Sequence, residues 1–136
     1  DATDFKNDYA KIQKYGKYGF IDKKGNIIVK PEYEHIISGS PAEKNIIVIL
    51  LGKYGIIDNA GSIIVDCNYD LIAPFSEGLA VIRENDKYGY IDETGMLKIS
   101  IIYDDAYDFS EGRAMVMKDD KTYYIDNQGI CILDCP

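Results

Sequence analysis

The chain has 136 residues, of which 46% are hydrophobic, and a formal net charge of −8 at pH 7. This is enough apolar material for one ordinary domain with a core, which argues against a disordered chain. The 15 Lys and Arg residues form no basic stripe, which argues against a nucleic-acid partner, and the longest apolar run, Ile46 to Leu51, is too short to span a membrane as a helix.

A tandem repeat organises the chain. The motif Lys-Tyr-Gly-x-Ile-Asp begins at Lys17, Lys53 and Lys87, and a degenerate copy begins at Lys121. Its four aspartates follow one another at steps of 36, 34 and 34 residues. A fixed period of this length predicts a stack of similar units. We therefore expect one domain over 1–136, with repeats at approximately 5–40, 41–74, 75–108 and 109–136.

A second motif, Phe-Ser-Glu-Gly-x-Ala, lies between these blocks. It runs from Phe75 to Ala80 and from Phe109 to Ala114, with a degenerate copy from Phe5 to Ala10. The segment from Ser38 to Asn45 has lost the motif and carries a two-residue insertion. The second motif is expected in the longer loop that leads into each following repeat.

Each repeat is expected to contain three short strands, illustrated in the third repeat by residues 80–83, 87–92 and 96–101. The second and third strands are joined by Asp-x-x-Gly, in which Asp suits the first position of a turn and Gly supplies the positive φ that closes it. The Asp and Gly residues assigned to this turn are Asp22, Gly25, Asp58, Gly61, Asp92, Gly95, Asp126 and Gly129.

Alternating apolar residues predict which faces of the strands are buried. On the first strand these residues are Ala10, Ile12, Ile46, Val48, Ala80, Ile82, Ala114 and Val116. On the third strand they are Ile27, Val29, Pro31, Ile63, Val65, Cys67, Leu97, Ile99, Ile101, Cys131, Leu133 and Cys135. We expect the three cysteines to behave as small hydrophobic residues on this face, because zinc normally uses close Cys or His pairs and an odd cysteine count does not suggest a disulfide framework.

These observations predict an all-β fold of four tandem three-stranded antiparallel units of about 34 residues. The main prediction is an open β-repeat array or solenoid. The alternative is a closed, four-bladed propeller-like ring. The two ends of the chain are consistent with both, because the sequence covers almost a whole number of periods.

The repeat resembles the WG, or KWG, family, whose core is Lys-Trp-Gly-Tyr-Ile-Asp-x-x-Gly followed by an apolar strand, Tyr-Asp and Phe-x-Glu-Gly. Here Tyr18, Tyr54 and Tyr88 replace the family's Trp, and the fourth repeat has Thr122 and Tyr123 in place of the aromatic-Gly pair. The resemblance covers essentially the whole chain. It implies a bacterial repeat protein, often exported or fused to other domains, although free cysteines would argue against export.

No catalytic, cofactor or metal site is expected. The single histidine, His35, leaves a Ser or Cys nucleophile without its usual base, and the turn aspartates are spread one per repeat instead of converging on an ion. The chain is therefore predicted not to be an enzyme.

Identical repeats place the same side chain at regular intervals, which suits an extended partner. We expect a non-catalytic protein-interaction or scaffold module that binds a protein or peptide, with a glycan or cell-wall binder as the alternative. Aromatic residues can either bind a partner or seal one repeat against the next. The candidate binding residues are Tyr18, Tyr54, Tyr88, Tyr90, Glu77, Glu111, Asp104 and Asp105.

Overall fold

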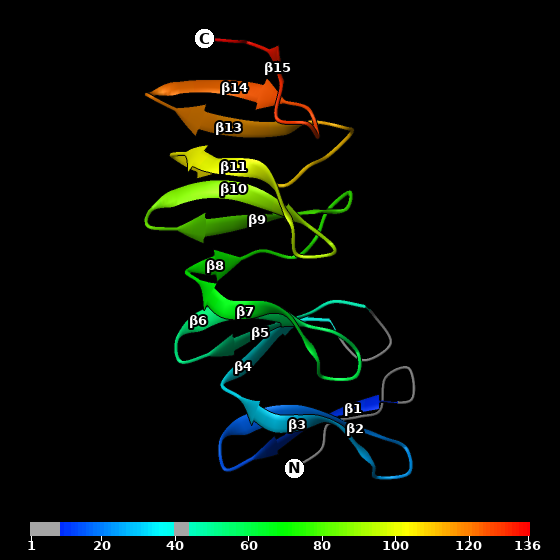
Figure 1. Cartoon of the computed structure of the whole chain (residues 1–136). Coiled ribbons are helices and arrows are strands. Elements are labelled where there is room, and N and C mark those ends of the chain that lie inside the picture. The colour runs from blue at the N-terminus through cyan, green and yellow to red at the C-terminus, as the bar shows by residue number, and fades with distance from the viewer. Residues whose placement is uncertain (1–8, 40–43) are drawn as a thin grey trace. The chain divides into compact units, whose positions relative to one another are not determined.

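The computed structural model describes residues 9–39 and 44–136, and within them every regular element is a strand (Figure 1). The chain divides into two compact units, residues 1–68 and 69–136. The predicted motif copy at Phe5 and most of the insertion after Ser38 lie outside the described residues.

The N-terminal unit carries two antiparallel sheets, with strand orders β1-β2-β3 and β4-β5-β6-β7. Their bounds are β1 Tyr9–Lys14, β2 Lys17–Asp22, β3 Ile27–Tyr33, β4 His35–Ser38, β5 Ile46–Leu50, β6 Lys53–Ile57 and β7 Ile63–Tyr69, the last of which ends one residue into the second unit.

The C-terminal unit carries the other two antiparallel sheets, with orders β8-β9-β10-β11 and β12-β13-β14-β15. Their bounds are β8 Leu71–Ile72, β9 Leu79–Glu84, β10 Lys87–Asp92, β11 Leu97–Tyr103, β12 Asp105–Ala106, β13 Ala114–Lys118, β14 Lys121–Ile125 and β15 Cys131–Leu133. The all-β prediction is confirmed. Among the described residues no sheet closes into a barrel, in agreement with an open repeat array.

The prediction of three strands per repeat is incomplete, because each sheet after the first contains a short fourth strand. β4, β8 and β12 follow the Tyr-acid step of one repeat and pair with the first strand of the next, as in Leu71↔Arg83 and Ala106↔Val116. The sequence pattern predicts a loop for this segment. Segments of two to four residues carry too little alternation to identify a strand, so only the partner strand defines them.

The expected buried face of the first strand in each repeat is confirmed. Ala10, Ile46, Val48, Ala80, Ile82, Ala114 and Val116 are all buried. Ile12 is half-buried. Period-two alternation identified this face, and Ile47 and Val81, on the opposite face of β5 and β9, are buried as well.

The expected single apolar face of the third strand is wrong. Register shifts interrupt the pairing of β3 with β2 and of β11 with β10, and each shift places extra residues on the third strand. Such bulges change the side to which following residues point. Val29 and Ile99 are therefore buried, whereas Ile27 is 58% and Leu97 is 50% exposed.

Each unit has its own hydrophobic core between its two sheets. In the N-terminal unit, Phe20, Val29 and Tyr33 pack with residues of β5 and β6. In the C-terminal unit, the Tyr90 ring meets the Phe109 ring edge-on, with centroids 5.0 Å apart. The aromatic residues thus seal one repeat against the next.

Candidate binding surface

The Asp-x-x-Gly turn has the same hydrogen bonds in all four repeats. In the first, Asp22 Oδ1 accepts the backbone N–H groups of Lys24 at 2.9 Å and Asn26 at 2.8 Å. The N–H of Gly25, whose φ is 86°, donates to the Asp22 carbonyl at 3.0 Å. Asp58, Asp92 and Asp126 accept equivalent bonds. These carboxylates are committed to their own turns.

These bonds lower the pKa of two turn carboxyl groups. The N–H of Asn26 and its side-chain amide hold the pKa of Asp22 below its ordinary value, and the Thr94 hydroxyl does the same at Asp92. A hydrogen bond to the charged form favours ionisation, so the shift has a structural cause and does not indicate a catalytic acid.

A second set of acidic residues joins successive repeats. Each follows the tyrosine that ends the third strand and accepts a backbone N–H from the next turn between first and second strands. Glu34 accepts from Leu51 at 2.7 Å and Gly52 at 3.1 Å. Asp70 accepts from Asn85 at 3.1 Å, and Asp104 accepts from Asp119 at 3.0 Å.

Two of these carboxylates also face the lysine of their own repeat. Lys17 lies 3.9 Å from Glu34, and Lys87 donates to Asp104. The Lys87 ammonium and the Asp119 N–H lower the pKa of Asp104, while the N–H groups of Gly52 and Leu51 lower that of Glu34. Asp104 therefore links three segments of the C-terminal unit.

The Phe-Ser-Glu-Gly motif forms a tight turn that also couples repeats. Glu77 and Gly78 have φ values of 52° and 79°, and Ser76 exchanges backbone hydrogen bonds with Leu79. The Ser76 hydroxyl donates to the Phe109 carbonyl at 2.7 Å, and Glu77 Oε1 accepts the Gly112 N–H at 2.9 Å. Ser76 and Glu77 of one copy of the motif thus bind the backbone of the next copy.

Of the acidic candidates for a binding surface, Glu111 alone makes no side-chain hydrogen bond or ion pair with the described residues. Asp105 accepts the N–H of Ala106 at 2.9 Å and the Tyr107 hydroxyl at 3.1 Å, which raises the pKa of Tyr107. Asp104 and Glu77 form the links given above. Sequence position alone did not reveal these links, because their partners lie 15 or more residues away.

The aromatic candidates divide into buried and half-buried residues. Tyr90 is 0% exposed, and its hydroxyl donates to the Tyr107 carbonyl at 2.7 Å, so it is removed from the candidate surface. Tyr18, Tyr54 and Tyr88 are half-buried. The Tyr18 ring stacks with His35 at 6.4 Å and lies under the Lys11 ammonium at 5.4 Å.

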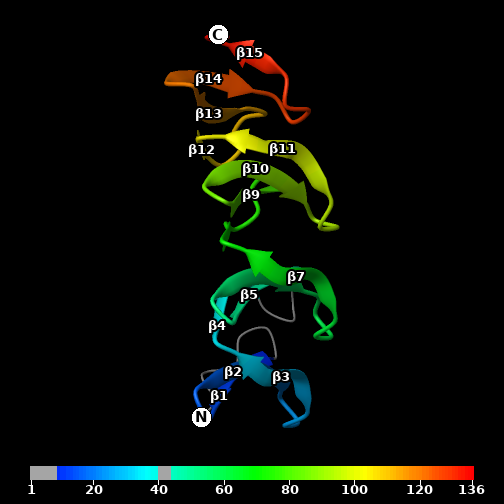
Figure 2. The ribbon, with the colours of Figure 1, turned by 60° about the vertical axis from the view of Figure 1, so that its left-hand side comes forward.

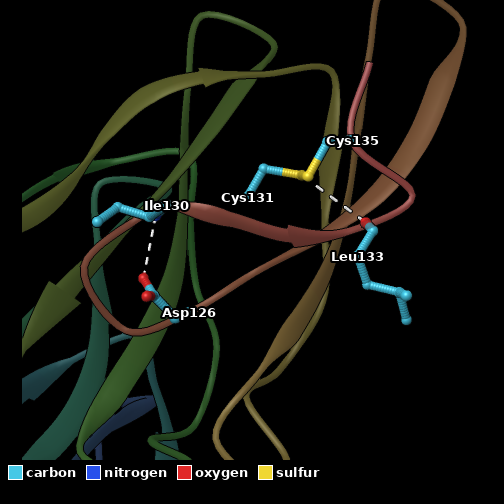
Figure 3. Close-up of a disulfide and its surroundings, with 5 residues drawn as sticks. All are labelled: Asp126, Ile130, Cys131, Leu133 and Cys135. Atoms are coloured by element: carbon cyan, nitrogen blue, oxygen red, sulfur yellow. Dashed lines mark hydrogen bonds between the residues drawn. A yellow bond between two sulfur atoms is a disulfide. The ribbon is translucent and has the colours of Figure 1, made fainter.

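Two cysteines form a disulfide, which corrects the prediction that all three are free hydrophobic residues. Figure 3 shows the bond between Cys131 and Cys135 at β15. Cys131 is half-buried against the C-terminal core, and Cys135 is exposed. Cys67 is a half-buried free thiol whose pKa burial raises.

The disulfide accompanies the loss of glycine at Tyr123. In earlier repeats the third strand passes directly over the equivalent glycine. A Cβ on Gly55 would lie 2.6 Å from the Val65 carbonyl oxygen, and one on Gly89 would lie 2.7 Å from that of Ile99. β15 ends at Leu133, and the Cys131–Cys135 bond joins the next residues back to its start. A tyrosine is accommodated at position 123, where it is buried.

A set of exposed apolar side chains was missed by the sequence analysis. Ile27 is 58%, Ile63 is 64% and Leu97 is 50% exposed. They begin the third strand of the first three repeats, and β3, β7 and β11 are each the edge of a sheet (Figure 2). Register shifts accompany the exposure of Ile27 and Leu97, and period-two reasoning without a partner strand could not detect them.

Residues 9–39 and 44–136 contain no group of three or more His, Cys, Asp or Glu side chains that could hold a metal ion. None of these segments forms a helix with the length and apolar character needed to cross a membrane.

Comparison with known proteins supports the repeat. The model of the WG containing repeat matches residues 1–18, 18–53, 54–88 and 88–121. A search of curated proteins found no match. The four matches follow one another over residues 1–121, and their boundaries fall at the second strand of each repeat, in β2, β6, β10 and β14. The chain belongs to the WG containing repeat family.

Proposed function

We propose that this chain is a non-catalytic protein-interaction module. The observation that carries the proposal is the exposed apolar residue at the same edge-strand position of three repeats: Ile27, Ile63 and Leu97. Exposed apolar side chains beside unpaired strand edges favour contact with another polypeptide. A partner that engages more than one repeat gains affinity from each.

The net charge of the chain indicates the kind of partner, and the disulfide indicates the compartment. The net charge of −8 favours a partner with a basic surface, whose association weakens as salt rises. The Cys131–Cys135 disulfide supports a location in an oxidising compartment, because structural disulfides persist mainly there.

The test uses peptide arrays with the purified chain as the probe. Peptides in which aliphatic residues alternate with Lys are compared with matched peptides in which Glu replaces Lys. Stronger binding to the Lys series, decreasing with salt, is expected. Ile27→Ser, Ile63→Ser and Leu97→Ser should each weaken binding by about 1–2 kcal/mol, or about fivefold to thirtyfold in Kd, and the triple variant should weaken it further.

Met96→Ser is the matched control, because Met96 is 66% exposed beside Leu97 but lies outside the strand. It should leave binding unchanged. Complete loss of binding from one substitution in one repeat would contradict a surface shared by repeats. So would selective binding to a glycan array without binding to peptides, and turnover of a small molecule would contradict the non-catalytic role.

A further inference from the structure

An open groove of about 500 Å³ lies within the N-terminal unit. Its volume is in the range of small-molecule binding sites, roughly 300–1,000 Å³. Both repeats of the unit contribute to its lining. The lining residues are Glu32, Tyr33, Leu50, Leu51, Ile57, Ile63, Val65, Asp66 and Cys67, all within residues 1–68.

The two units differ at this place. In the C-terminal unit the Tyr123 ring packs against Tyr103, with ring centroids 6.4 Å apart. The equivalent residues in the N-terminal unit are Gly55 and Tyr33. Gly55 has no side chain, and the Cys67 thiol lies 2.7 Å from the place where its Cβ would be. The N-terminal unit therefore lacks the second tyrosine side chain that packs against Tyr103 in the C-terminal unit.

The lining combines apolar walls with negative charge. Leu50, Ile63 and Val65 provide aliphatic surface, and the charged lining residues are Glu32 and Asp66, both exposed carboxylates. No Lys or Arg is among the lining residues. An alkyl chain gains free energy by leaving water for the walls, while a positive group gains from the carboxylates.

We propose that this groove binds a small aliphatic amine, with its alkyl chain against Leu50, Ile63 and Val65 and its ammonium beside Glu32 and Asp66. This site goes beyond the protein-interaction role. It lies within one unit and does not require a partner that spans several repeats, so the two proposals fail separately.

Cys67 makes the proposal directly measurable. The chain has three cysteines, and two form the Cys131–Cys135 disulfide, so Cys67 is the single free thiol and lines the groove. The rate of Cys67 alkylation by N-ethylmaleimide under non-reducing conditions reports occupancy. Octylammonium, octanol and octanoate, each below its aggregation concentration, share the alkyl chain and differ in charge.

Octylammonium should protect Cys67 at the lowest concentration, about threefold to tenfold below octanol, with octanoate the weakest. Asp66→Asn should reduce this preference for the cation. The control Asp134→Asn changes the equivalent exposed aspartate of the fourth repeat and should leave the preference intact. Ligand titrations followed by amide chemical shifts of Ile57 and Val65 give a second readout that does not depend on the thiol.

Ile63→Ser should weaken all three ligands, because it removes apolar lining from an exposed position that folding does not require. Leu97→Ser, at the equivalent position of the third repeat, is its control. Equal protection by all three ligands, no protection by any, or equal effects of the groove variants and their controls would overturn the proposal.

Discussion

At the residue scale, glycine decides whether the third strand can cross the second. Gly19, Gly55 and Gly89 lie where the third strand passes so closely that a Cβ would meet its backbone oxygen at 2.3–2.7 Å. A glycine inside a strand normally weakens it, so its recurrence in the Lys-Tyr-Gly motif predicts a close approach by another group. The structure supplies the reason, which is the backbone of the bulged third strand.

Gly55→Val and Gly89→Val are therefore expected to destabilise the protein by about 1–3 kcal/mol or more, because the third strand must move away. Denaturant unfolding measures the change. Gly52→Asn is the control, since a Cβ on Gly52 meets nothing within 4 Å and Asn tolerates its φ of 75°. A Gly55→Val variant as stable as this control would disprove the close approach.

At the element scale, acidic side chains connect one repeat to the next. Glu77 accepts the N–H of Gly112 across 35 residues, whereas Glu111, the same residue of the next motif, has no such bond among the described residues. The two glutamates share local sequence and turn conformation, with φ values of 52° and 54°. They differ in whether another repeat follows them within the described fold.

Glu77→Ala should cost about 0.5–1.5 kcal/mol, the usual range for one hydrogen bond. Glu111→Ala should stay within about 0.5 kcal/mol of the parent, as expected of an exposed side chain without a partner. Thermal or denaturant unfolding of the two variants side by side measures the difference. Equal losses would show that the glutamate acts through its own turn and not through the neighbouring repeat.

The Cys131–Cys135 disulfide also acts at the scale of a single element. It closes a short loop at β15, so its effect should be confined to that strand and its partner β14. Cys135→Ser should speed amide hydrogen exchange at Ile125 and Cys131 while leaving β9 and β10 protected, because exposed edge strands near a terminus open locally. Cys67→Ser controls for cysteine loss elsewhere. Unchanged exchange at β15 in Cys135→Ser would contradict a role in holding this strand.

At the scale of the whole molecule, several carboxylates of this acidic chain accept hydrogen bonds within the fold. Asp22, Glu34, Asp92 and Asp104 all have a lowered pKa because hydrogen bonds favour their charged forms. In contrast, burial raises the pKa of Tyr33, Tyr90 and Tyr103. These two sets act at opposite ends of the pH scale.

The free energy of unfolding should fall at both low and high pH. A lowered carboxyl pKa means that the unfolded chain binds more protons, so stability is present above the ordinary values of 3.8 for Asp and 4.5 for Glu and is lost as pH falls through the lower folded values. A raised tyrosine pKa means that the folded chain keeps its protons longer, so stability is lost above the ordinary value of 10.0. Urea unfolding between about pH 2 and pH 11 measures both limbs. Asp92→Asn should flatten the acid limb, and a flat profile in the parent would contradict the assignment.

The sequence by itself determined the period, the strands around the Lys-Tyr-Gly motif, the buried face of the first strand and the residues of the Asp-x-x-Gly turn. These depend on contacts within a few residues, where side-chain alternation and turn geometry are encoded directly. Tertiary structure decided the short strands β4, β8 and β12, the exposed side of Ile27 and Leu97, the burial of Tyr90 and the partners of Glu77 and Asp104. Each depends on a neighbouring strand or on a residue from the next repeat, so no local pattern contains it. The Cys131–Cys135 bond lies between the two classes, because the residues are close in sequence but pair only where β15 ends and the chain turns back.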